Sequence, residues 1–164
     1  MKKNMIALFL RISIIIVGLF GIVMCVFMYP FAVSLNTYGL MDVEPATIQQ
    51  LIRSWVQLSF YWIASIPCFI ILIIIWKISI IIKKDDLFSN NIVNLINIVI
   101  YTLFIDLTFF LVGNVIFLIL RWRIFNALYF MLIILGLVII SFFWIASEII
   151  KKGIEYKEDV EGTI

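Results

Sequence analysis

The sequence predicts an all-α integral membrane protein, an antiparallel four-helix bundle with both termini in the cytoplasm. The first observation is composition: 65% of the residues are hydrophobic, only 13% are charged, and the mean hydropathy is +1.22. A soluble domain has about 45–50% apolar and about 25% charged residues, so no soluble core would bury this much apolar surface. The second observation is a set of four long apolar stretches, and the third is the placement of the basic residues between them.

Each of the four apolar stretches is long enough to cross a bilayer, which takes about 20 residues. The first is too long for the core of a signal peptide, about 7–15 residues, and no small-residue cleavage site follows it. We therefore expect one membrane domain over residues 1–164. Its spans are expected at about 6–31, 55–82, 92–120 and 124–150.

The connections between the spans are recognised by polar residues and by helix-boundary signals. The longest connection, an outer loop at 34–54, is expected to end in a short helix that runs into the second span. Pro67 lies near the centre of that span and predicts a kink, because proline removes one backbone hydrogen bond. The Arg-Trp-Arg sequence at 121–123 predicts a tight turn, so the third and fourth helices should be antiparallel neighbours. A polar cytoplasmic tail is expected at 151–164.

The basic residues are distributed unevenly over the two sides of the predicted bundle. Four spans put both termini on one side, and that side carries nine of the twelve basic residues: Lys2, Lys3, Arg11, Lys77, Lys83, Lys84, Lys151, Lys152 and Lys157. The other side carries Arg53, Arg121 and Arg123. Lys and Arg accumulate on the cytoplasmic side of membrane proteins. We therefore expect a multi-pass protein of the bacterial plasma membrane with both termini inside.

The residue types of most catalytic and metal sites are missing. There are no histidines, which removes the commonest general base and the commonest metal ligand. Cys25 and Cys68 lie in apolar runs without a Cys-x-x-Cys motif, and we read them as small apolar side chains. We therefore expect no enzymatic activity, no cofactor and no metal. The net charge of +2 is too small to predict direct binding of nucleic acid.

Asp106 is the one carboxylate near the middle of a predicted span, and ionisable residues at that depth are typical of functional sites. By count along the spans it lies level with Ser65 and Pro67, and with glycines of the first and fourth spans. We expect a protonated Asp106 that donates a hydrogen bond to the backbone near Pro67. Its functional interpretation is an intramembrane switch that responds to protons or to a ligand; its structural interpretation is a packing contact.

A polar stripe runs along another face of the third span. At 100° per residue, Asn94, Asn97, Tyr101 and Thr108 lie close to one direction, and Asp106 lies nearly opposite. Lipid contact is costly for such groups, so both faces should point into protein. Hydrogen bonds to neighbouring helices are the structural interpretation of the stripe. A polar path for a transported ion or solute is the functional one.

The predicted cytoplasmic side holds the third candidate site. Ser89 is placed to cap the third helix, with Phe88 before it as part of a hydrophobic staple. Acidic residues follow the last span at Glu155, Glu158 and Asp159. They indicate either a solvated tail or a docking surface for a small basic cytoplasmic protein. In the second case Phe88 and Ser89 are expected to contact that protein together with the tail.

Two stretches are similar to a known family. After the second span a basic pair, Phe-Ser and a following Leu occur at Lys83, Lys84, Phe88, Ser89 and Leu95. Near the C-terminus a Gly-centred turn, acidic residues and a final Thr-Ile occur at Gly153, Glu155, Glu158, Thr163 and Ile164. These stretches resemble the bacterial domain-of-unknown-function family number 2975, over nearly the whole chain. The sequence departs from the family at 160–162, where Val-Glu-Gly replaces an acidic pattern ending in Asp-Leu.

The resemblance implies a small four-span membrane protein without an assigned reaction, often encoded near a small helix-turn-helix regulator. The first hypothesis is therefore a non-enzymatic sensor that acts as regulatory partner of such a cytoplasmic DNA-binding protein. The alternative is an immunity protein against a bacteriocin or peptide, and the second alternative is a small proton-coupled transporter that uses Asp106. Beyond the lipid bilayer, a further copy of the chain is a candidate partner, because Gly18 and Gly21 offer a close-approach surface.

Overall fold

Four long helices make up the computed structural model, which describes residues 2–37, 48–83, 88–120 and 126–161. They are α1 (Lys2–Thr37), α2 (Ile48–Lys83), α3 (Asn90–Ile119) and α4 (Asn126–Glu161). Each contains an apolar stretch long enough to cross a membrane, and the described ranges contain no strand. A helix satisfies its backbone polar groups internally, which a lipid environment requires. The predicted all-α class with four membrane-spanning helices is confirmed.

The helices are longer than the predicted spans. α1 continues to Thr37 and α2 already begins at Ile48, so the short helix predicted before the second span forms the first turns of α2. α2 stays one helix through Pro67. α4 continues to Glu161, so most of the predicted tail is helical. The predicted turn at 121–123 lies outside the described residues.

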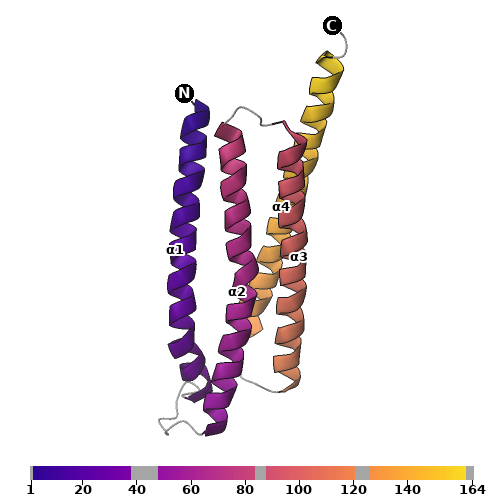
Figure 1. The fold of residues 1–164 in the computed structure, drawn as a ribbon. Coiled ribbons are helices and arrows are strands. Elements are labelled where there is room, and N and C mark those ends of the chain that lie inside the picture. The colour runs from indigo at the N-terminus through magenta and orange to yellow at the C-terminus, as the bar shows by residue number, and fades with distance from the viewer. Residues whose placement is uncertain (1, 38–47, 84–87, 121–125, 162–164) are drawn as a thin grey trace.

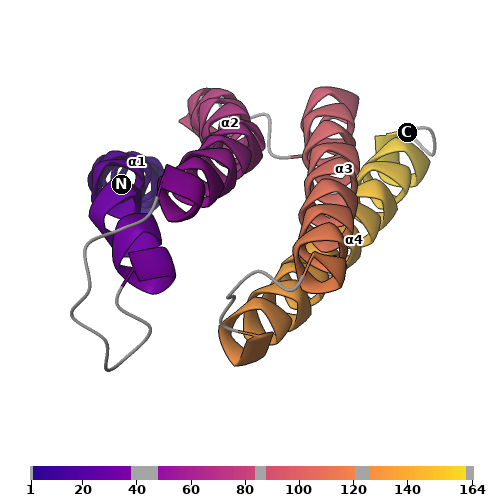
Figure 2. The same ribbon diagram turned by 90° about the horizontal axis from the view of Figure 1, so that it is seen from below.

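The helices pack in a row in the order of the sequence (Figures 1 and 2). α1 contacts α2, α2 contacts α3, and α3 contacts α4; within the described ranges α1 contacts neither α3 nor α4. Figure 1 shows that consecutive helices run in opposite directions, so the start of α1 and the end of α4 lie on the same side. Because the row does not close into a ring, α1 is held by α2 alone.

Aliphatic side chains form the core where α2, α3 and α4 meet. Its buried members are Ile71, Ile74, Ile78, Ile92, Ile96, Val99, Ile100 and Ile140. Ile140 comes from α4, and the other seven occupy the C-terminal half of α2 and the N-terminal half of α3. This half of the α2–α3 contact is therefore packed by β-branched side chains, which are stiff and keep their shape in a helix.

Aromatic rings fill the other half of the contact between α2 and α3. The Phe60 ring of α2 stacks on Phe109 with 5.1 Å between centroids, and meets the edge of Phe117 at the same distance. Directly beneath the ring is Gly113 of α3, where a Cβ atom would overlap it. The close approach of the two helices here therefore requires glycine at 113.

Polar contacts join α1 and α2 at two levels along the pair. Near the start of α1, Arg11 Nε donates to Ser79 Oγ at 2.9 Å, and the guanidinium carbon lies 5.5 Å from the centre of the Trp76 ring. Farther along, Trp62 Nε1 donates to the backbone carbonyl of Cys25 at 3.1 Å. Arg11 therefore lies against α2, where its charge is shared between a hydroxyl and an aromatic face.

Small residues separate these polar contacts along the same seam. A Cβ atom at Gly18 would lie 3.7 Å from Leu72 Cδ1, and one at Gly21 would lie 3.4 Å from Phe69 Cζ. Both glycines therefore face α2 of their own chain. The close-approach surface that the sequence offers on α1 is used within the chain.

Replacing Arg11 with methionine is expected to loosen α1 from α2. The change removes a charge-assisted hydrogen bond, worth about 1.5–3 kcal/mol, and leaves Ser79, 0% exposed, without this partner. The reporter is the rate of disulfide formation between cysteines introduced at Gly18 and Leu72, in a chain whose own two cysteines are replaced by alanine. We expect the rate to fall severalfold in Arg11→Met.

The matched control for that experiment is Lys77→Met. It removes one positive charge from an exposed position of α2 close to Ser79 in sequence. This control should leave the rate of disulfide formation unchanged. Equal rates in wild type and Arg11→Met would show that the Arg11 contacts do not hold α1.

Candidate functional site

Asp106 lies in the contact between α2 and α3, beside the residue that follows Pro67. The Cys68 thiol donates to Asp106 Oδ2, with 3.8 Å between sulfur and oxygen. The other carboxyl oxygen, Oδ1, is buried and has no hydrogen-bond partner in the part of the chain that the structure describes. A thiol is a weak donor. The carboxyl group is therefore only partly satisfied, and its bond goes to Cys68 instead of the backbone near Pro67.

The neighbours of Asp106 match the depth expected from counting along the spans. Phe69, next to Cys68, meets Gly21 of α1, and Leu107, next to Asp106, meets Gly136 of α4. Glycines of the two outer helices are thus level with the carboxyl group. Of the two candidates named with Asp106, Pro67 adjoins its partner Cys68. Ser65 instead donates to the carbonyl of Trp62 in its own helix at 2.7 Å.

Cys68 is the member of this site that sequence reasoning missed. We expected both cysteines to act as small apolar side chains, but Cys68 is exposed on α2 and donates to a carboxyl group. Its position directly after a mid-span proline was the available signal. The hydrogen bond depends on the rotation of α2 relative to α3, which a single sequence does not show.

The four residues of the predicted polar stripe have different environments. Asn97 accepts a hydrogen bond from Ser147 Oγ of α4 at 3.1 Å, so it joins two helices. Thr108 donates to the carbonyl of Phe104 in its own helix at 2.8 Å. Asn94 and Tyr101 are exposed, and the Tyr101 side chain also lines a groove beside α4. The stripe therefore does not form one continuous polar surface.

A groove of about 460 Å³ lies between α3 and α4. We call it the α3–α4 groove; its lining residues are Asn97, Ile100, Tyr101, Phe104, Trp144, Ser147, Glu148 and Lys151. Within it Lys151 Nζ lies 2.7 Å from Glu148 Oε1. The groove therefore combines aromatic and aliphatic walls with one ion pair and two hydrogen-bonded polar side chains.

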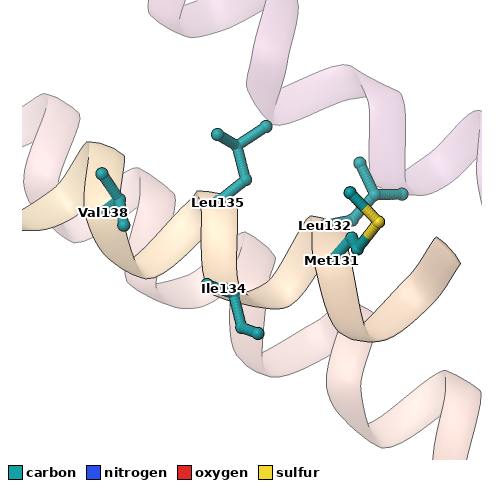
Figure 3. A pocket seen from close by; sticks show the side chains of 5 residues that line it. All are labelled: Met131, Leu132, Ile134, Leu135 and Val138. Atoms are coloured by element: carbon teal, nitrogen blue, oxygen red, sulfur yellow. The ribbon is translucent and has the colours of Figure 1, made fainter. Parts of the chain in front are cut away.

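Two further hollows in the described residues are apolar. One, of about 300 Å³, lies along the α1–α2 seam beside Trp76. The other, of about 360 Å³, is lined by Met131, Leu132, Ile134, Leu135 and Val138 of α4 (Figure 3). Figure 3 shows Leu135 and Ile134 projecting from the helix in different directions, so this hollow is part of an open aliphatic surface. Such a surface suits lipid contact.

Phe88 and Ser89 form the entry to α3. Ser89 stands at the predicted capping position with extended backbone angles of −130° and 145°, and its carbonyl accepts from Ile92 N at 3.0 Å. Its hydroxyl does not cap the helix, and within the described ranges Oγ is buried without a hydrogen-bond partner. The Phe88 ring lies against Gly153 of α4, where a Cβ atom would overlap it. Gly153 therefore provides a close contact within a helix, in contrast to the turn that the resemblance implied.

The acidic candidates lie on the last turns of α4. Glu155, Glu158 and Asp159 are exposed, and at 100° per residue they fall within about one third of the helix circumference. Figure 1 shows that this end of α4 extends beyond the other three helices. The structure thus places the three carboxylates on one projecting helix face, and places Phe88 against the same helix about one turn before them.

These helices and their intramembrane contacts define the class of the protein: a multi-pass membrane protein of four helices. The sequence profile of the family described as "Protein of unknown function (DUF2975)" matches residues 41–164. The chain belongs to this family. The match covers α2, α3 and α4 and includes Asp106, Phe88 and Gly153, whereas α1 lies outside it. Neither the curated proteins nor the solved structures that were compared gave a match.

Proposed function

We propose that this protein is a non-enzymatic sensor of the bacterial plasma membrane that holds a small basic cytoplasmic protein on the last turns of α4. The unequal placement of Lys and Arg supports a cytoplasmic position for that end of the helix. The observation that carries the proposal is the projecting acidic face at Glu155, Glu158 and Asp159. Exposed carboxylates on one helix face attract a partner of opposite charge.

The continuity of α4 supports a role in signalling. One helix runs from Asn126 to Glu161, so it joins the membrane-embedded contacts to the acidic face without a flexible connection. Its contacts with the rest of the chain include those of Ser147 with Asn97 and of Gly153 with Phe88. A shift of α4 against α3 would therefore move the acidic face, which is how a signal received in the bundle would reach the partner.

A helix-turn-helix regulator of the kind that the family resemblance implies fits this surface. The DNA-binding face of such a protein is basic, because it neutralises phosphate groups. An acidic helix face would bind the same surface, so binding to the membrane protein and binding to DNA would exclude each other. The partner would then be released to DNA when the bundle changes its arrangement.

The test is recovery of a bound protein from membranes solubilised in mild detergent. We compare the wild type with the triple variant Glu155→Gln, Glu158→Gln and Asp159→Asn. Exposed ion pairs contribute about 0.2–1 kcal/mol each, so three should change recovery by roughly tenfold. The recovered protein should be basic, and 0.5 M salt, roughly a 4 Å screening length, should release it.

The control removes positive charges from the same helix, to test whether the sign of the charge decides binding. Lys152→Gln combined with Lys157→Gln neutralises two exposed residues on the last turns of α4. Recovery should not fall in this control. A partner recovered equally well with the acidic triple variant and with the wild type would refute docking on this face.

A small proton-coupled transporter is the second candidate, and Asp106 is the observation that favours it. Its Oδ1 atom is buried without a hydrogen-bond partner among the described residues, and carboxyl groups within membrane spans are typical of proton relays in transporters. Uptake into vesicles driven by an imposed proton gradient, compared between wild type and Asp106→Asn, distinguishes this candidate from the sensor. The immunity alternative depends on the outer loop, of which residues 38–47 lie outside the described ranges.

A further inference from the structure

The α3–α4 groove changes character along its length. Because α3 and α4 run in opposite directions, Glu148 and Lys151 lie at the end of the groove nearest the start of α3. Asn97 and Ser147 follow, and Phe104 lies at the other end. The groove therefore runs from a charged mouth near the helix ends to an aromatic floor deeper in the apolar span. An amphipathic molecule that lies along α3, with its head group at the mouth and its apolar part at the floor, matches this order of polarity.

The charges at the mouth indicate what kind of head group fits. Glu148 and Lys151 lie one turn apart on α4 with 2.7 Å between their charged atoms, and their side chains are 50% and 43% exposed. Both can therefore turn toward a ligand. The pair carries no net charge, so an anion alone would meet the Glu148 carboxylate as well as the Lys151 ammonium. A head group with one negative and one positive charge satisfies both residues.

Uncharged donors lie between the mouth and the floor. Ser147, 1% exposed, donates to Asn97 Oδ1 and so fixes the orientation of that carboxamide. The NH₂ group of the same amide is left as a donor. The Tyr101 side chain, 70% exposed, adds a phenolic hydroxyl on the α3 side. These donors lie between the charged mouth and Phe104, in the same order in which ester oxygens lie between the head group and the acyl chains of a phospholipid.

We propose that the α3–α4 groove binds an aminophospholipid of the phosphatidylethanolamine type. Its phosphate would bind Lys151 and its ammonium group Glu148. The ester oxygens would accept from Asn97 and Tyr101, and the first part of an acyl chain would lie against Phe104. The volume of about 460 Å³ is in the range of small-molecule sites, about 300–1,000 Å³. This site is separate from the acidic face on the last turns of α4.

The test is native mass spectrometry of the purified protein, with equal amounts of phosphatidylethanolamine and phosphatidylglycerol that have the same acyl chains. The wild type should retain phosphatidylethanolamine in preference. Glu148→Gln should lower the ratio of the two retained lipids about fivefold, the effect of one partly exposed ion pair. Glu148→Lys should reverse the preference, because the mouth then carries two positive charges.

The matched controls change the same charge outside the groove. Glu155→Gln and Glu155→Lys lie two turns farther along α4 and should leave the lipid ratio at the wild-type value. Phe104→Ala should weaken retention of both lipids without changing their ratio. The proposal is wrong if the wild type shows no preference, or if Glu148 and Glu155 variants give the same ratio.

Discussion

A Gly113→Ala variant is expected to lose much of its stability, because the added Cβ atom overlaps the Phe60 ring. The ring has little room to move, since it is packed against Phe109, Phe110 and Phe117. Overpacking a core costs about 1–3 kcal/mol, which is a large part of the stability of a small protein. The measurement is the midpoint of thermal unfolding in detergent, followed by the fluorescence of the tryptophans.

Two comparisons make this prediction specific to the contact of α2 with α3. Gly18→Ala adds the same atom in the α1–α2 seam, where its nearest neighbour would be 3.7 Å away, and should change the midpoint little. Phe60→Leu, combined with Gly113→Ala, should recover part of the loss because the smaller side chain leaves room. If Gly113→Ala has the same midpoint of thermal unfolding as the wild type, the two helices do not meet at this residue.

Asp106→Leu is expected to raise the thermal stability of the protein. The carboxyl group has one oxygen buried without a partner and a second bonded only to the Cys68 thiol at 3.8 Å. An unsatisfied buried polar group costs about 1–3 kcal/mol, and leucine has a similar size without that cost. Functional sites often lower the stability of a protein, so a substitution that stabilises such a site commonly costs activity. We therefore expect Asp106→Leu to be more stable than the wild type and to have lost the response to protons or to a ligand.

The outcome separates the two interpretations of Asp106. If the residue is a packing contact, Asp106→Leu should melt at a lower temperature than the wild type. If it is a switch, the melting temperature should rise, and the recovery of the cytoplasmic partner should no longer depend on the protons or the ligand to which the switch responds. Cys68→Ala is the companion variant: it removes the thiol that donates to Asp106 and should make the effect of Asp106→Leu larger.

The helices could be predicted from the sequence because each is specified by residues that are neighbours in the chain. A run of apolar residues of bilayer length specifies a membrane helix, so α2, α3 and α4 are found close to the predicted spans. The depth of Asp106 within its span could also be predicted, because depth is obtained by counting residues at 1.5 Å per residue. The shared depth of Asp106 and Pro67 is seen in the hydrogen bond to Cys68, the next residue.

The contacts between helices could not be predicted in the same way. Which faces meet depends on rotation and crossing angle, and these are set by the shapes of side chains on both helices. The pairs Ser147 with Asn97 and Gly153 with Phe88 are therefore visible only in the structure. The family resemblance implied a turn centred on Gly153, and glycine often ends helices. Here its missing side chain makes room for a ring from a distant part of the chain.

The place of Arg11 has a consequence for how the protein is made. Arg11 lies near the start of α1, and its partner Ser79 lies near the end of α2. A chain is synthesised from its N-terminus, so the ribosome has to add 68 more residues after Arg11 before the hydroxyl that receives its hydrogen bond exists. The contact of Arg11 with Ser79 can therefore form only after most of α2 has been synthesised, later than the contact of Trp62 with Cys25. Until then the charge of Arg11 depends on water and lipid head groups, which keeps the start of α1 at the membrane surface.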